Sequence, residues 1–100
     1  MLRAENAVHA SDYLKSLSHP TRLSILCRLV RGPAHVGELE ALLDLPQAAV
    51  SKQLARLRAQ GLVDARRAGR NMFYTLSDAR TARIIGALDD AFCAPDTAHD

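Results

Sequence analysis

The chain has 100 residues, of which 48% are hydrophobic and 24% are charged, and these proportions indicate one small globular domain over residues 1–100. No apolar run approaches the roughly 18 residues that span a bilayer, and the N-terminus lacks the long apolar segment of a signal peptide, so we expect a cytoplasmic protein. A domain of this size buries only about 60–70% of its unfolded surface, so the monomer is expected to be marginally stable and to dimerise.

The formal net charge of +2 is distributed unevenly along the chain. Residues 1–46 contain five basic and five acidic side chains, whereas residues 47–75 contain six basic side chains and one acidic side chain, a net charge of +5. Residues 76–100 contain two arginines and five aspartates, a net charge of −3. We therefore expect a polyanion to bind the segment 47–75.

Hydrophobic periodicity predicts five helices separated by short breaks. The second helix is expected to begin at Pro20, because the first turn of a helix does not use the N–H that proline lacks. Gly61 is expected to end the fourth helix as its C-terminal cap, and Ser77 is expected to cap the last one. The predicted helices span residues 5–17, 20–31, 37–43, 47–60 and 78–93, and the chain ends at about 1–4 and 95–100 are expected to be mobile.

Residues 62–68 and 72–76 are predicted to form a β-hairpin around Gly69, Arg70 and Asn71. With the helices, this hairpin gives the order α-α-α-α-β-β-α. That order is typical of a winged helix-turn-helix, a mainly α fold with a two-stranded β-wing.

Two stretches of the chain carry motifs that are specific in combination: LKSLSHPTRLSILCRLV and VGELEALLDLPQAAVSKQLARLRAQGLVDARRAGRNMFYTL. In the first, HPTRLSIL opens the second helix, and in the second, VSKQLARLRAQGLV runs from the fourth helix into the hairpin. From about Tyr13 to Phe92 the chain therefore resembles the ArsR/SmtB family of bacterial repressors. The resemblance implies a repressor that binds double-stranded operator DNA as a homodimer through its first and last helices.

In that family the fourth helix enters the major groove and the wing contacts the minor groove or the backbone. The residue types here fit that use, because glutamine can pair with adenine, lysine with guanine, and arginine with phosphates. The alternative, that these charges only solvate an exposed surface, is less favoured because they cluster with almost no acidic neighbours. Pro46 stands where the family often has a Ser or Thr cap. The expected DNA-contacting residues are Gln47, Ala48, Ser51 and Lys52 in the groove, Arg56 and Arg58 at phosphates, and Arg66, Arg67, Arg70 and Asn71 on the wing.

A twofold dimer would place its two recognition helices roughly 34 Å apart, so the expected operator is an inverted repeat. The candidate interface residues are apolar side chains of the first and last helices. Their alternative role is the intrachain core, and we expect each to serve partly in both. These residues are Val8, Tyr13, Leu14, Ile84, Ile85, Leu88 and Phe92.

A metal site of the ArsR/SmtB type is not expected, and no cofactor is expected. The family's thiolate site uses a Cys-x-Cys pair at the start of the third helix, where this chain has His35, Val36 and Gly37. Its other site uses further histidines on the last helix, where this chain has Asp89 and Asp90. Four tetrahedral ligands cannot be assembled from these residues. The histidines at positions 9, 19 and 35 are therefore interpreted as surface or capping residues.

Cys27 and Cys93 are the only two cysteines. By residue type alone, Cys27 in an apolar helix is a small core residue, whereas Cys93 at a helix end fits that interpretation less well. The stretches LSILCRLV and LDDAFCAP place the two cysteines as in one branch of the family, the persulfide- and polysulfide-responsive repressors (SqrR/BigR-like). The resemblance implies that reactive sulfur species link Cys27 and Cys93 within one subunit as a di- or polysulfide and release the repressor from DNA.

Other functions stay open. The chain can instead be a metal-responsive or general thiol-redox ArsR-type repressor, or a dimeric interaction module that does not bind DNA. An enzyme is not expected, because no histidine base and oxyanion site are visible around a nucleophile. An ordinary disulfide needs Cα atoms within about 7 Å, whereas inserted sulfur atoms bridge a wider gap, so the Cys27–Cys93 separation would decide the selectivity between polysulfides and peroxide.

Overall fold

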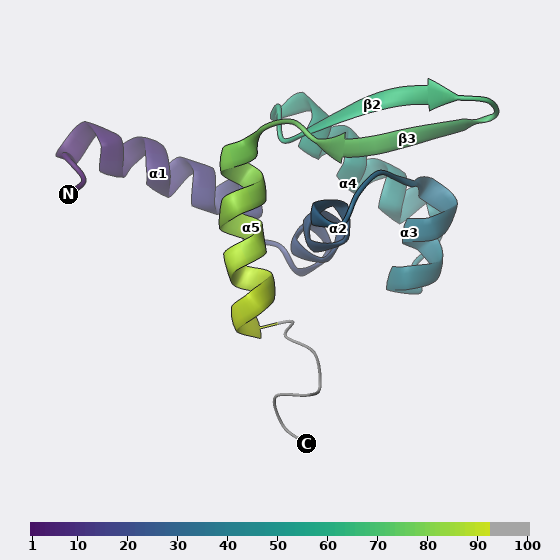
Figure 1. The fold of residues 1–100 in the computed structure, drawn as a ribbon, viewed down its shortest axis with the longest axis horizontal. Coiled ribbons are helices and arrows are strands. Elements are labelled where there is room, and N and C mark those ends of the chain that lie inside the picture. The colour runs from purple at the N-terminus through teal and green to yellow at the C-terminus, as the bar shows by residue number, and fades with distance from the viewer. Residues whose placement is uncertain (93–100) are drawn as a thin grey trace, which may run out of the picture.

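A computed structural model describes residues 1–92 of the chain, and Figure 1 shows its helices with a small sheet at one edge. The described residues confirm the predicted order of helices and hairpin, with helix bounds that differ by one or two residues. The predicted helix end at Cys93 lies outside the described residues. The elements are α1 (Ala4–Leu17), α2 (Pro20–Val30), β1 (Ala34–His35), α3 (Val36–Leu43), α4 (Gln47–Ala59), β2 (Val63–Ala68), β3 (Asn71–Leu76) and α5 (Ala79–Phe92).

Helix α2 lies at the centre of the fold and contacts α3, α4, α5 and β3. Its apolar composition explains this position, because side chains on most of its surface can be buried against a neighbour. Within residues 1–92, none of the helices is long and apolar enough to cross a membrane. The fully or almost fully buried core includes Ile25, Leu26 and Leu29 of α2, Leu39 of α3, Val50, Leu54 and Leu57 of α4, and Ile85 of α5.

The sheet has a third strand that the sequence pattern does not predict. Its order is β1-β3-β2 with antiparallel pairing, and β1 pairs Ala34 with Tyr74 of β3. Strand β1 has only two residues, which is too short for a period-two pattern to be recognised. In the wing, Ala68 pairs with Asn71 across Gly69, whose φ of +63° favours glycine. Asn71 therefore begins β3 rather than lying in the turn.

Histidines cap two of the helices, as the capping interpretation predicts. The Nδ1 atom of His19 accepts a hydrogen bond from the backbone N–H of Thr21 at 3.2 Å, at the start of α2. At the start of α3, the backbone N–H of Glu38 donates to His35 Nδ1 at 3.3 Å, and the backbone N–H of His35 donates to Glu38 Oε1 at 3.0 Å. This reciprocal pair is a capping box, and it satisfies two backbone donors that the helix itself leaves unpaired.

The residue that caps α5 is Asp78 rather than Ser77. The Asp78 carboxylate accepts a hydrogen bond from the backbone N–H of Thr81 at 2.7 Å. The Ser77 hydroxyl oxygen is buried and makes no hydrogen bond within residues 1–92. The predicted cap was thus one residue too early, because the chain enters the helix only after Asp78.

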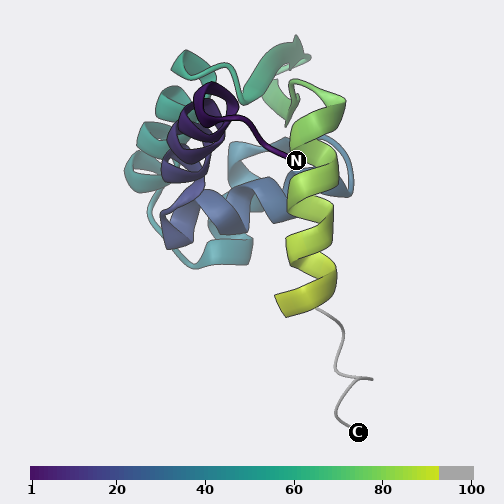
Figure 2. The ribbon, with the colours of Figure 1, turned by 90° about the vertical axis from the view of Figure 1, so that its left-hand side faces the viewer.

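Helix α1 projects beyond the rest of the molecule on the side where α5 lies, while the tip of the wing projects on the opposite side (Figure 1). Viewed from the α1 side, α5 runs along one edge of the molecule (Figure 2). Only Leu17 of α1 is buried, so most of this helix is open to solvent within one protomer.

Candidate functional site

Helix α4 has one buried face and one open face. Val50, Leu54 and Leu57 are fully buried, and their spacing of four and three residues puts them on one side of the helix. Most of the remaining arc is exposed to solvent. Pro46 occupies the N-cap position and forms no side-chain cap hydrogen bond, but its φ of −66° suits the entry to the first turn.

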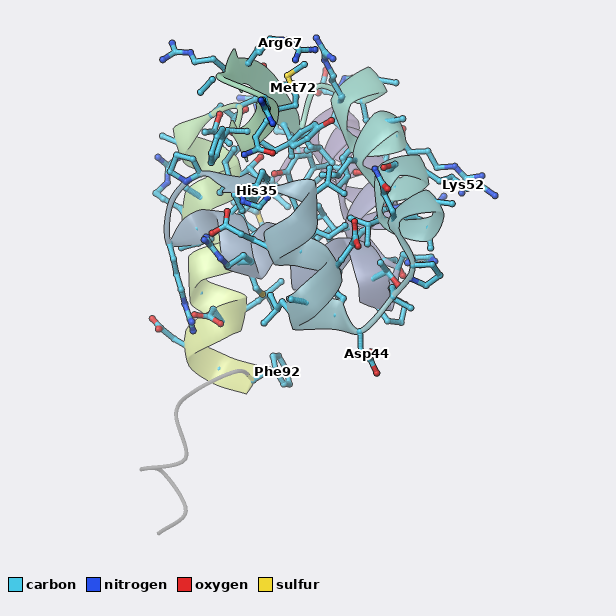
Figure 3. All side chains as sticks on the ribbon, turned by 90° about the vertical axis from the view of Figure 1, so that its right-hand side faces the viewer. His35, Asp44, Lys52, Arg67, Met72 and Phe92 are labelled. Carbon is cyan, nitrogen blue, oxygen red and sulfur yellow. The ribbon has the colours of Figure 1, made fainter. Side chains whose placement is uncertain are left out.

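The predicted DNA-contacting residues lie on α4 and on the wing formed by β2, β3 and the turn between them. Figure 3 shows Lys52 on α4 and Arg67 on the wing extending away from the body of the protein. Ser51 is half-buried, and the other nine residues are exposed: Gln47, Ala48, Lys52, Arg56, Arg58, Arg66, Arg67, Arg70 and Asn71.

The basic side chains of this surface are not neutralised from within the protein. Among residues 1–92, the ion pairs join Glu38 to Arg28 at 3.8 Å and to His35 at 3.7 Å. None of the six lysine and arginine side chains of residues 47–75 takes part in one. Their positive charge is therefore available to an external polyanion.

A hollow of about 400 Å³ lies between α4 and β3. Ser51, Ala55 and Arg58 line it from the helix, and Tyr74 lines it from the strand. Tyr74 is a further candidate contact that the sequence pattern does not reveal, because a tyrosine in a strand is usually a core residue. Its position in the alternating strand pattern beside the basic hairpin was the only available signal. A hydroxyl and a guanidinium beside one concave surface suit a phosphate backbone.

Cys27 is half-buried on α2 and lines a second cavity, of about 270 Å³, between α2, α3 and α5. Arg28 and Arg31 contribute positive charge to its wall, and Asp89 of α5 contributes negative charge. Cys93 follows Asp89 by four positions in the sequence and lies outside the described residues. The Cys27–Cys93 pairing thus stays a prediction.

A metal site is not formed by the described residues. Within residues 1–92, no three side chains among His, Cys, Asp and Glu lie close enough together to hold an ion. His19 and His35 each use a ring nitrogen as a helix cap. At the position of the family's thiolate pair, His35 also contacts the ring of Phe73 edge-on, with centroids 5.3 Å apart.

The candidate dimer residues divide into three groups by exposure. The exposed fractions of Val8, Leu14 and Phe92 are 59%, 55% and 82%, which leaves these apolar side chains without cover in one protomer. Tyr13, Ile84 and Leu88 are half-buried. Ile85 is fully buried inside the protomer, which fits the intrachain-core alternative for this residue and not a direct contact with a partner. Its side of α5 packs into the core cluster that also contains Ile25 and Leu26 of α2.

Helices α1 and α5 are held together by a polar contact. The hydroxyl groups of Tyr13 and Thr81 form a hydrogen bond, and the guanidinium of Arg80 lies 5.2 Å from the centre of the Tyr13 ring. A cavity of about 540 Å³ opens beside this contact, with Leu2, His9 and Ile84 in its wall. The two helices therefore present a joint surface.

Comparison with known proteins agrees with this architecture. Residues 19–65 match the family described as bacterial regulatory protein, arsR family. The chain is 46% identical over 92 residues to the biofilm growth-associated repressor of Agrobacterium fabrum, covering 92% of this chain and 79% of that protein. It is 39% identical over 89 residues to the transcriptional activator HlyU of Vibrio cholerae, covering 89% of this chain and 82% of that protein.

Solved structures give the same result. The crystal structure of the transcriptional repressor BigR from Xylella fastidiosa has a TM-score of 0.83 at 42% identity, covering 90% of this chain and 89% of that chain. Reduced HlyU from Vibrio cholerae has a TM-score of 0.84 at 39% identity, covering 89% of this chain and 94% of that chain. The chain therefore belongs to the ArsR family of bacterial regulatory proteins, in its BigR-like branch.

Proposed function

We propose that this protein is a dimeric transcriptional repressor that binds an inverted-repeat operator and leaves it when Cys27 and Cys93 become linked by reactive sulfur species. Helix α4 enters the major groove, and the wing lies along the flanking backbone. The DNA-binding part is supported by the exposure of nine of the ten candidate contacts on α4 and the wing, whose basic side chains form no ion pair within residues 1–92.

The roles of the residues on this surface follow from their chemistry. Gln47 and Lys52 offer the donors that read adenine and guanine edges, and Ala48 offers a methyl contact to thymine. The arginines of α4 and the wing bind phosphates and set the register of the protein on DNA. The exposed apolar side chains of α1 and α5 cover one another in the dimer, which brings two copies of α4 onto successive turns of the groove.

The sulfur-sensing part is supported by the cavity beside Cys27. An organic tetrasulfide can enter such a space, and its sulfur chain is the electrophile. One cysteine thiolate attacks a sulfur of the chain, breaks an S–S bond and releases the distal part as a thiolate or persulfide anion. The second cysteine thiolate then attacks the mixed polysulfide and releases the remaining part. The two cysteines are oxidised to a di- or polysulfide, and the reagent takes up the two electrons.

The linkage acts on DNA binding by joining α2 to the C-terminal end of α5. A cross-link can contribute roughly 2–4 kcal/mol, and an allosteric coupling of about 1–3 kcal/mol already changes operator occupancy severalfold or more. Two relatives, BigR and HlyU, are named a repressor and an activator, so the sign of regulation needs its own measurement.

Operator binding tests the DNA-binding part. Gel shift or fluorescence anisotropy with DNA upstream of the protein's own gene should give a sequence-preferring complex whose affinity falls as salt rises. A reporter fused to the same DNA should be expressed more strongly when the repressor gene is deleted. Absence of any complex at low salt would support a dimeric interaction module instead.

Thiol variants test the sensing part. Treatment with an organic tetrasulfide should release the wild-type protein from DNA, and intact mass should show both cysteines joined by added sulfur atoms. Cys27→Ser and Cys93→Ser should each keep their DNA after the same treatment, with thermal unfolding as the control for folding. If both variants still release DNA, the sensing proposal fails while DNA binding stands. Release by zinc in these variants would favour a metal-responsive repressor.

A further inference from the structure

Arg22 connects three elements through its guanidinium group. Its Nε atom donates a hydrogen bond to Oε1 of Gln53 on α4 at 3.1 Å. Its Nη1 atom donates to the backbone carbonyl of Ser16, near the end of α1, at 2.9 Å. Arg22 itself lies in the first turn of α2. One side chain thus joins the α1–α2 corner to the middle of the recognition helix.

The contact adds a polar, directional restraint to the apolar packing of α4. The buried side chains Val50, Leu54 and Leu57 already attach one face of α4 to the core. The N-terminus of α4 has no side-chain cap at Pro46. A hydrogen bond from a charged donor is shorter and stronger than a neutral one, and it depends on angle. The Arg22–Gln53 bond therefore opposes rotation of α4 about its own axis.

Gln53 is adjacent to the groove-facing side chains without belonging to them. It follows Ser51 and Lys52 on α4, but it is half-buried and directed towards α2, whereas Lys52 is exposed. A small rotation of α4 would move Ser51 and Lys52 relative to the base edges. Hydrogen bonds to base edges require positions within a few tenths of an ångström, so base reading depends on this rotation.

We propose that Arg22 is a positioning residue for operator recognition: it orients α4 through Gln53 and does not itself bind DNA. The inference rests on the proposed DNA-binding function. Two of the guanidinium nitrogens already donate within the protein, and the side chain is half-buried, unlike the exposed Arg56 and Arg58. Those two arginines are free to contact phosphates, whereas Arg22 is held by its partners.

A double-mutant cycle with salt titration tests the proposal. Arg22→Met and Gln53→Met each remove the hydrogen bond and leave an unbranched apolar side chain, which in Gln53→Met has the length of the original. Each single variant is expected to weaken operator binding about 3- to 10-fold. Relative to wild type, the double variant should lose no more affinity than the weaker-binding single variant. The slope of log affinity against log salt should be unchanged in all three. The matched control Arg56→Met should reduce the slope by about 0.9, the value for one lost phosphate contact.

Gln53→Met keeps the proposal testable if Arg22→Met does not fold, because it leaves the Arg22–Ser16 bond in place. Additive losses in the cycle, unchanged affinity of Gln53→Met, or a reduced salt slope in Arg22→Met would each overturn the positioning role. A wild-type protein that forms no salt-sensitive complex would overturn the proposed function together with this inference. A wild-type complex with additive losses would overturn the inference alone.

Discussion

Removing the hydroxyl group of Tyr13 should destabilise the protein more than removing the hydroxyl group of Thr81, its hydrogen-bond partner. The hydroxyls of Tyr13 and Thr81 are hydrogen-bonded across 68 positions of sequence, and Thr81 is fully buried whereas Tyr13 is half-buried. In Tyr13→Phe, the buried Thr81 hydroxyl loses this partner and cannot reach solvent. In Thr81→Val, the hydroxyl that remains belongs to Tyr13 and can bond to water. The ring stays in Tyr13→Phe, so its contact with Arg80 is retained.

The burial of Thr81 sets the magnitude. A buried polar group left without a partner lowers the free energy of unfolding by about 1–3 kcal/mol. Loss of a hydrogen bond lowers it by only about 0.5–1.5 kcal/mol when the remaining group can bond to water. We therefore expect about 1–3 kcal/mol for Tyr13→Phe and the smaller range for Thr81→Val. The double variant leaves no buried hydroxyl group without a partner, so it should be more stable than Tyr13→Phe alone.

Chemical and thermal unfolding at one fixed protein concentration would measure these differences, because dimerisation makes stability depend on concentration. For a domain of 60–100 residues, about 1 kcal/mol corresponds to a Tm change of about 4–8 °C, which is easily resolved. A larger loss for Thr81→Val than for Tyr13→Phe would refute the reasoning. So would a double variant whose loss equals the sum of the two single losses.

Three further predictions concern helix termini. His35→Ala should lower the free energy of unfolding by about 0.5–2 kcal/mol because the cap of α3 is lost, and His35→Asn should restore most of it; equal losses in urea unfolding would contradict the capping role. Asp78→Ala should destabilise the protein while Ser77→Ala should not, and the reverse order in thermal unfolding would reinstate Ser77 as the cap. The hydrogen bond from the backbone N–H of Thr81 lowers the pKa of Asp78. The stability that the Asp78 carboxylate contributes is therefore present above its ordinary pKa of about 4 and is lost as pH falls below that value. Asp78→Asn should flatten this part of the acid-unfolding profile, and an unchanged profile would exclude Asp78 as its source.

The local pattern of the sequence determined which segments are helices and which form the wing. Apolar side chains recur with the period of a helix, and Pro20 and Gly61 mark two boundaries that the structure keeps within one or two residues. Charge clustering likewise identified the surface of α4 and the wing, because side chains directed away from a helical stripe stay exposed in any fold that buries the stripe. Such features depend on neighbours in sequence.

Contacts between distant residues were decided only by the tertiary structure. The Arg22–Gln53 and Tyr13–Thr81 hydrogen bonds span 31 and 68 positions, and no periodicity relates their members. The third strand and the burial of Ile85 also depend on how α5 and β3 pack against the rest of the chain. Periodicity specifies which face of a helix is apolar, but it does not specify what covers that face. For this protein, the sequence determined the elements and the positive charge of α4 and the wing, while packing decided how α4 is held and which apolar side chains of α1 and α5 stay exposed in one protomer.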